Sequence, residues 1–295
     1  NYGGDSSSVS ADLQSGVTQI FSNEHAFAAL KEDGSVVTWG MPWGGGDSSS
    51  VASHLQSDVS QISSTETAFA ALKDDGSVVV WGESLTGGYI GSGNNLKFDV
   101  TQIFSTQGAF AALKEDGSVV TWGDSNRGSN SSAISANLRS GVTQVYSNYS
   151  AFAALKEDGS VVTWGDSNRG GSSSAVSEDL QSGVTQIFST DYAFAALKED
   201  GSVITWGDEG GGGDSSSVSA DLQSGVTQLF SNWKAFAALK EDGSVVSWGE
   251  SSVGGNSSSV DADLQSGVVS LADPFRDDRL VMEVPSSDPS PALDL

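Results

Sequence analysis

One segment recurs six times at nearly constant spacing, and this repeat constrains the fold more than any other feature. The segment Phe-Ala-Ala-Leu-Lys-Glu-Asp-Gly-Ser-Val-Val-Thr-Trp-Gly occupies residues 27–40, and close copies begin at Phe69, Phe110, Phe152, Phe194 and Phe236. Successive copies start 42, 41, 42, 42 and 42 residues apart. Units of this size contact mainly their neighbours, so we expect one continuous architecture rather than separate domains.

The residue types within one unit predict short antiparallel strands. Residues 17–22 are rich in β-branched and aromatic side chains, and residues 26–30 form an apolar run typical of a strand that is buried on both faces. Five apolar residues are also compatible with helix, but the Asp-Gly that follows at residues 33–34 favours a hairpin. Residues 35–39 then form the returning strand. We interpret the Gly/Ser-rich remainder as a connection that contains a short outer strand, which gives three or four strands per unit.

A sheet of three or four short strands cannot bury two apolar faces alone, and radial stacking of such sheets solves this problem. The sequence therefore predicts an all-β fold, a β-propeller of about seven blades in a single domain over residues 1–285, followed by a flexible tail at 286–295. The seventh blade, within residues 268–285, is degenerate, with Val284 in place of the repeated Trp. Six blades plus a cap is the alternative count, and a β-solenoid is the rival architecture.

The chain is strongly acidic, with a formal net charge of −25 and only 13 Lys and Arg among 295 residues. Nucleic acids and anionic membrane surfaces both require clustered cations, so neither is an expected partner. There is no cysteine, which excludes disulfides and thiol chemistry. Residues 1–4 resemble residues 168–171, which follow a Trp-Gly pair, so we expect the natural chain to extend upstream.

No residue pattern predicts a catalytic, metal or cofactor site. The acidic pairs in the hairpin turns, such as Glu32-Asp33, could form a ring of calcium ligands, but solvated turn residues explain them better. His25 and His54 occupy non-equivalent places, and we interpret them as surface histidines. The glycine runs at 44–46 and 210–213 lack the Lys of a phosphate-binding loop, so we interpret them as flexible connections. The six repeated Trp are expected to fill the space between blades.

The units differ from one another at two places, the pair before the apolar strand and the segment after Trp-Gly. Along the predicted chain path both places fall on one end of the propeller, and the constant Asp-Gly turns fall on the other. Loops that vary among identical units are the usual location of a binding surface, although drift in unconstrained loops is the alternative explanation. The candidate partner-binding residues are Glu24, His25, Trp43, Tyr89, Arg127, Tyr149, Arg169, Asp191, Tyr192, Trp233 and Lys234.

The repeat resembles that of the regulator of chromosome condensation family, through the pattern Ala-x-x-Ala-Leu-x-x-Asp-Gly-x-Val-x-x-Trp-Gly. The likeness covers residues 5–285, and it implies a seven-bladed propeller. The Gln-Ser-Gly-Val segments at 14–17, 181–184 and 223–226 are similar to a subgroup of secreted bacterial propellers that inhibit β-lactamases. The chain departs from the family in having Ala before the buried strand where His is frequent, as at Ala26 and Ala68.

These features together predict a non-catalytic protein-interaction module or scaffold subunit that binds a protein partner through one loop face. The sequence does not define the compartment, and an extracellular, organelle-lumenal or periplasmic location is the favoured expectation. An inhibitor of a secreted enzyme is the sharper form of this hypothesis. A carbohydrate-binding, lectin-like propeller is the alternative from a different class, because exposed aromatic residues stand beside polar loops.

Overall fold

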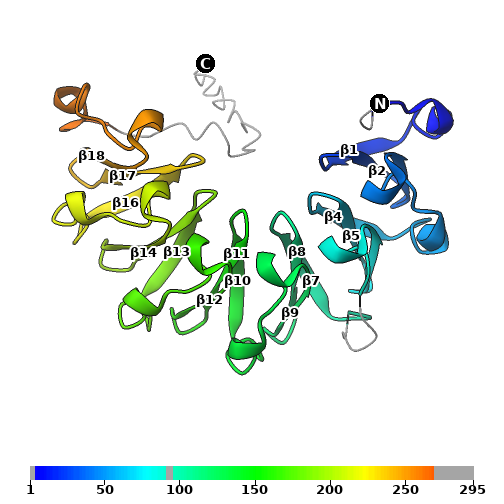
Figure 1. Ribbon diagram of the computed structural model, residues 1–295, viewed down its shortest axis with the longest axis horizontal. Coiled ribbons are helices and arrows are strands. Elements are labelled where there is room, and N and C mark those ends of the chain that lie inside the picture. Colours follow the sequence, from blue (N-terminus) through cyan, green and yellow to red (C-terminus); the bar gives the residue numbers. More distant parts are fainter. Residues whose placement is uncertain (1–3, 91–95, 269–295) are drawn as a thin grey trace, which may run out of the picture.

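The chain folds into six three-stranded antiparallel sheets, each a meander in which the second strand pairs with both others. The computed structural model describes residues 4–90 and 96–268. The sheets stand side by side in an arc, with the first and sixth sheets at its two ends (Figure 1). We call the sheets blades 1 to 6. The prediction of an all-β repeat propeller is confirmed for these six blades, which span an arc rather than a complete ring.

The strand bounds repeat with the period of the sequence. They are β1 (Val17–Ser22), β2 (Ala26–Lys31), β3 (Val36–Gly40), β4 (Val59–Ser64), β5 (Ala68–Lys73), β6 (Val78–Gly82), β7 (Val100–Ser105), β8 (Ala109–Lys114), β9 (Val119–Gly123), β10 (Val142–Ser147), β11 (Ala151–Lys156), β12 (Val161–Gly165), β13 (Val184–Ser189), β14 (Ala193–Lys198), β15 (Val203–Gly207), β16 (Val226–Ser231), β17 (Ala235–Lys240) and β18 (Val245–Gly249). The first strands of neighbouring blades contact one another and so line the inside of the arc.

Adjacent blades pack through the small and large residues of the middle strand. The face of blade 1 toward blade 2 presents Ala26, Ala28 and Leu30, which pack against Ile62 and Trp81 of blade 2. Alanine on one face leaves room for the aromatic and branched residues on the other, and this allows close packing without voids. The same arrangement recurs at the other junctions.

Each inner tryptophan also fastens its blade to the preceding one. The indole Nε1 of Trp81 donates to the carbonyl oxygen of Gly45 at 2.9 Å, and Trp206 donates to Gly170 at 3.0 Å. The prediction that the tryptophans fill the space between blades is therefore confirmed for these junctions. Gly45 has a positive φ of 95°, and a Cβ there would lie 2.6 Å from the Phe69 ring. The glycine runs are thus close-packed segments at the contacts between blades. The prediction that they are flexible connections was wrong.

Blade 1 shows what a blade looks like without a described neighbour on one side. Ile20 is 59% exposed, whereas its equivalents Ile62 and Ile187 are 3% and 2% exposed. Phe27 and Trp39 are only partly buried, although their equivalents in the other blades are buried. This apolar face of blade 1 is the face that a preceding blade would cover in a closed ring.

The Gly/Ser-rich connections contain short 3-10 helices instead of the expected outer strand, so this expectation was wrong. In each of the five connections between blades 1 and 6, a buried leucine accepts one backbone hydrogen bond from the third strand, as Leu55 does from Val36 at 2.9 Å. This single bond is made at the outer edge of the third strand. The serines around the leucine lack the alternation of apolar and polar residues that a fourth strand would need. None of the helices in the described part of the chain is long and apolar enough to cross a membrane. The helices are η1 (Ser7–Val9), η2 (Pro42–Gly44), η3 (Ser49–His54), η4 (Ser84–Thr86), η5 (Ser125–Arg127), η6 (Ser132–Ile134), η7 (Ser167–Arg169), η8 (Ser174–Val176), η9 (Glu209–Gly211), η10 (Ser216–Val218), η11 (Ser251–Val253) and η12 (Asp261–Leu264).

The predicted seventh blade lies almost entirely outside the described residues, as does the tail at 286–295. The junction into it is described. The N–H of Val268 donates to the carbonyl of Gly243 at 3.1 Å, and Val226 makes the equivalent bond to Gly201 at 3.0 Å. The chain therefore enters the seventh unit in the same register as it enters the sixth.

The aspartates of the hairpin turns are occupied by hydrogen bonds within the turns. The Oδ1 atom of Asp158 accepts from the Ser160 hydroxyl at 2.6 Å and from the Ser160 N–H at 3.0 Å. The hydroxyl bond, and then the backbone bond, hold the pKa of Asp158 below its ordinary value. Asp33, Asp75, Asp200 and Asp242 accept the same serine hydroxyl bond, and Asp116 accepts from the Ser118 N–H, so the turn itself accounts for an aspartate at each site.

Because these pKa values are lowered by folding, the turns should make the protein sensitive to acid. Their contribution to stability is complete above the unfolded-chain pKa of 3.8 and is lost as the pH falls through the lower folded value. We expect the melting temperature to fall as the pH drops below about 4. A triple change of Asp158, Asp200 and Asp242 to Asn should flatten this dependence, as measured by thermal unfolding between pH 5 and 2. Matched Glu→Gln changes at Glu157, Glu199 and Glu241 should leave the slope unchanged, and equal flattening would contradict the assignment to the turn aspartates.

Candidate functional site

The two variable segments of every unit lie together at one end of the blades. The residue after Trp-Gly donates its N–H to the carbonyl of the second variable residue, from Met41 to His25 at 2.9 Å and from Asp208 to Tyr192 at 3.0 Å. The Asp-Gly turns connect the other ends of the strands. We call the end with the variable segments the rim. The structure thus places both segments as the chain path predicted.

A fixed Asn or Thr shapes each rim loop, which explains why only two residues vary beside it. The Oδ1 atom of Asn148 accepts from the N–H groups of Ser150 and Ala151, and its Nδ2 donates to the Arg169 carbonyl at 2.6 Å. Thr190 makes the equivalent contacts in blade 5. Because the loop conformation depends on this residue, the variable side chains can change without altering the backbone.

Cations and aromatic rings alternate along the rim from blade 3 to blade 6. The Arg169 guanidinium lies 4.4 Å from the ring centres of both Tyr149 and Tyr192. Lys234 lies 5.2 Å from the Tyr192 ring and 5.0 Å from the Trp233 ring. At the other end of the series, Arg127 lies 5.9 Å from the Tyr149 ring. Such cation–π contacts stabilise a defined side-chain arrangement. We call these six residues the rim ladder; they are Arg127, Tyr149, Arg169, Tyr192, Lys234 and Trp233.

Carboxylates hold the two arginines of the ladder in place. Arg127 pairs with Glu66 at 3.4 Å and with Asp124 at 3.6 Å, while Arg169 pairs with Asp166 at 3.7 Å. Glu66 is absent from the predicted site residues, although its place in the variable pair of blade 2 was a signal for it. The ion pair between Glu66 and Arg127 extends the connected series of side chains to blade 2.

The remaining predicted residues do not join the ladder. In blade 1, His25 lies against Trp43 with ring centres 4.4 Å apart, and its Nε2 is 4.0 Å from a carboxylate oxygen of Glu24. Trp43 is 49% exposed and Tyr89 is 65% exposed. His54 is exposed, whereas His25 is half-buried, so only His54 fits the prediction of a surface histidine. Among the described residues, the predicted site therefore divides into the ladder, a small cluster in blade 1, Tyr89 and Asp191.

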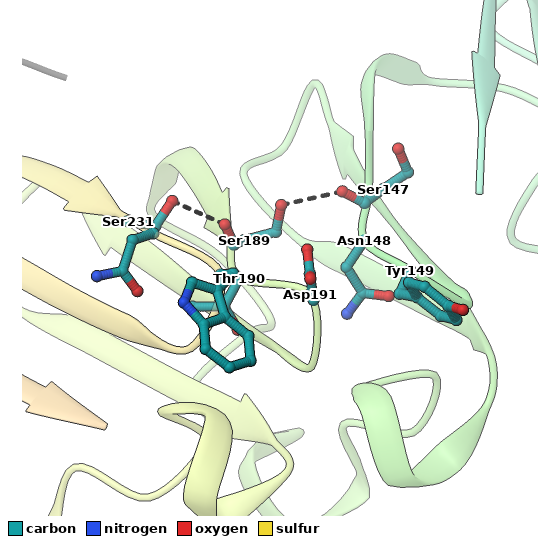
Figure 2. Close-up of a pocket in the computed structure, with 9 residues that line it drawn as sticks. Ser147, Asn148, Tyr149, Ser189, Thr190, Asp191 and Ser231 are labelled. Carbon is teal, nitrogen blue, oxygen red and sulfur yellow. Dashed lines mark hydrogen bonds between the residues drawn. The ribbon is translucent and has the colours of Figure 1, made fainter. Parts of the chain in front are cut away.

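A pocket of about 520 Å³ opens at the inner side of the rim, between blades 4, 5 and 6. It is lined by the equivalent triplets at residues 147–149, 189–191 and 231–233, which are the ends of β10, β13 and β16 and the loops that follow. Figure 2 shows the serines at its base joined across blades, where Ser231 donates to the Ser189 carbonyl and Ser189 donates to the Ser147 carbonyl. This volume lies within the usual range for ligand sites.

Asp191 contributes the single acidic side chain of the pocket lining. In Figure 2 its carboxylate lies between Ser189 and Tyr149. Desolvation raises the pKa of this carboxyl, and the positive charge of Arg169 opposes the shift. Among residues 4–90 and 96–268, no group of three or more His, Asp or Glu side chains is arranged to hold a metal ion. The chemistry that the site offers is aromatic contact, charge and hydrogen bonding.

The fold and the site together define a class, a repeat β-propeller with a constant core and one variable rim. No family model matches the chain, and no curated protein matches it in sequence. Similar solved structures include Prp20p from Saccharomyces cerevisiae (17% identity, TM-score 0.46, 79% of this chain and 72% of that one) and human WBSCR16 (16%, 0.47, 80% and 77%). The ectodomain of the Physcomitrella patens receptor kinase CR4 is similar at 15% identity and TM-score 0.46, over 79% of this chain and 61% of that one. All three scores lie below 0.5, so the fold assignment depends on the strand pairing within this chain.

Proposed function

We propose that this protein is a non-catalytic interaction module that binds a protein partner through its rim. The observation that carries the proposal is the rim ladder, in which half-buried cations and Tyr192 connect the exposed rings of Tyr149 and Trp233 across four consecutive blades. Tyr149 and Trp233 are 37% and 47% exposed. Aromatic residues and arginine are the types most enriched in protein interfaces and their hot spots.

The ladder also suits tight binding because its side chains are held before the partner arrives. Arg169 is fixed by two rings and by Asp166, so little rotamer freedom remains to be lost on association. The rim loops are linked by backbone hydrogen bonds between blades, from Gln107 to Tyr149 at 2.9 Å and from Asp191 to Trp233 at 3.1 Å. A rigid rim of this kind favours recognition of a folded partner surface.

Two other functions compete with a general interaction role. An inhibitor of a secreted enzyme is the narrower form and is supported by the Gln-Ser-Gly-Val segments. A carbohydrate-binding propeller is supported by the exposed rings of Tyr149 and Trp233 at the pocket. Sugars need several free polar groups, however, and the side chains of Asn148, Thr190 and Asn232 already hold the rim loops. This favours a protein partner.

The proposal is tested by capturing a partner from native extract on the immobilised protein and then measuring its affinity for variants. Tyr192→Ala and Trp233→Ala should each weaken binding about thirtyfold or more, which corresponds to about 2 kcal/mol. Each change removes an aromatic side chain of the kind that forms interface hot spots. The melting temperature should change little, since neither ring lies between blades.

The matched control is the opposite end of the blades, where Asp74→Ala and Glu157→Ala remove solvated charges from hairpin turns. Binding by these two variants should stay within about twofold of the unchanged protein. If the turn variants abolish capture and the ladder variants do not, the rim is not the binding surface. Binding to a glycan array that is lost in Trp233→Ala, with no protein captured, would support the lectin instead.

A further inference from the structure

The pocket forms at the one break in hydrogen bonding between the rim loops of blades 2 to 6. Backbone bonds join the loops of blades 2 and 3 through Glu66 and Gln107, blades 3 and 4 through Gln107 and Tyr149, and blades 5 and 6 through Asp191 and Trp233. Within the described chain, no equivalent bond joins Tyr149 of blade 4 to Asp191 of blade 5. Tyr149 and Asp191, which this break leaves unbonded, both line the pocket (Figure 2).

Most polar groups that line the pocket are already used by the fold. Asn148 and Asn232 hold their own loops, and the Ser189 and Ser231 hydroxyls donate to the neighbouring blades. The Asp191 carboxylate differs, because within residues 4–90 and 96–268 it accepts no hydrogen bond and has no basic group at ion-pair distance. An ionised carboxylate accepts hydrogen bonds and donates none, so a ligand that binds the Asp191 carboxylate must supply hydrogen-bond donors.

The nearest cations do not satisfy Asp191. The guanidinium of Arg169 lies against the rings of Tyr149 and Tyr192, and its Nε is 3.7 Å from a carboxylate oxygen of Asp166. Its buried Nη1 makes no hydrogen bond within the described residues, and its charge acts on Asp191 from beyond ion-pair distance. The ammonium of Lys234 lies over the rings of Tyr192 and Trp233. Since the ladder holds these groups elsewhere, Asp191 is left with negative charge directed into an open pocket.

We propose that the pocket receives an arginine side chain from the partner, so that the guanidinium binds the Asp191 carboxylate and stacks on Trp233. The proposal deepens the proposed function by naming the chemistry of the partner. The N–H of Asp191 donates to the Trp233 carbonyl, so the two side chains leave neighbouring points of the rim. Trp233 is 47% exposed, which leaves ring surface for a planar cation. The formal charge of −25 attracts a basic segment from a distance.

The test uses a probe that does not depend on the partner, the blocked peptide acetyl-Gly-Gly-Arg-Gly-Gly-amide. Its affinity is measured by NMR titration of the Trp233 indole N–H signal, which is assigned by its loss in Trp233→Phe. The matched probe replaces arginine with citrulline, which is neutral and nearly the same shape. We expect the arginine peptide to shift the signal saturably. Asp191→Asn should raise its Kd about tenfold, as for a lost charge-assisted hydrogen bond.

The control variant is Glu209→Gln, which removes an exposed acid of the same blade outside the pocket lining, and its Kd should stay within about twofold. The proposal is overturned if the citrulline peptide binds equally well, if Asp191→Asn binds arginine unchanged, or if about 10 mM arginine peptide shifts nothing. In each case a partner captured through Tyr192 and Trp233 would leave the interaction role intact. Conversely, arginine binding without any captured partner would leave the pocket assignment intact.

Discussion

Replacing Trp206 with alanine is expected to lower the free energy of unfolding by about 3–5 kcal/mol, the range for large aromatic residues removed from a core. Trp206 is 4% exposed, and it stacks on Phe194 with ring centres 5.4 Å apart. Its indole also donates to the Gly170 carbonyl of the preceding blade at 3.0 Å. The change therefore leaves a cavity between blades and removes the partner of a buried carbonyl. Urea denaturation measures the loss.

The repeat supplies a matched control for this change. Trp39 occupies the same position in blade 1 and stacks on Phe27 at 5.2 Å, but it is only partly buried and has no described blade before it. Trp39→Ala should therefore be clearly less destabilising than Trp206→Ala. Equal losses would mean that the exposed face of blade 1 is covered in solution as completely as the faces between blades.

Ending the chain at Gly267 is expected to destabilise the protein by several kcal/mol or to cause aggregation. The face of blade 6 away from blade 5 carries Ala235, Leu239 and Val245, which are 3%, 5% and 9% exposed. Their equivalents in blades 1 to 5 pack against a following blade, and baring a buried aliphatic side chain costs about 1.5–3 kcal/mol. Bare apolar sheet faces also promote association. Thermal unfolding and light scattering measure both effects.

The control removes residues 286–295 alone, which were predicted to be a tail. This shorter deletion should leave the melting temperature and the oligomeric state unchanged. If the deletion from residue 268 is equally harmless, the seventh unit does not contribute to the propeller, and six blades plus a cap is the better description.

The strands were predictable because they depend on contacts within one unit. The expected strand at residues 17–22 coincides with β1, and the apolar run at 26–30 is contained in β2. The structure of the outer connection was not predictable, because its serines and glycines show no periodicity and its one buried residue, Leu55 between blades 1 and 2, gives no pattern. Propensity has little influence on such a segment.

The clustering of the variable segments at one end of the blades was predictable, but the arrangement of their side chains was not. Unit-to-unit comparison selected Arg169, Tyr149 and Tyr192 because they vary. That Arg169 lies between the two rings depends on the angle between neighbouring blades, and no pattern within a unit specifies that angle. The position of Asp191 at the pocket was hidden for the same reason, since it depends on which backbone bonds the neighbouring loops make.

The identical joints between blades have a consequence for how such a protein can change over generations. Every described inner tryptophan donates to the carbonyl of the equivalent glycine in the preceding unit. Any unit can therefore follow any other while the packing between blades stays the same. Unequal recombination between the repeats would thus reorder the rim residues while the blades continue to fit. A chain of this design explores new binding surfaces by shuffling whole units as well as by point mutation.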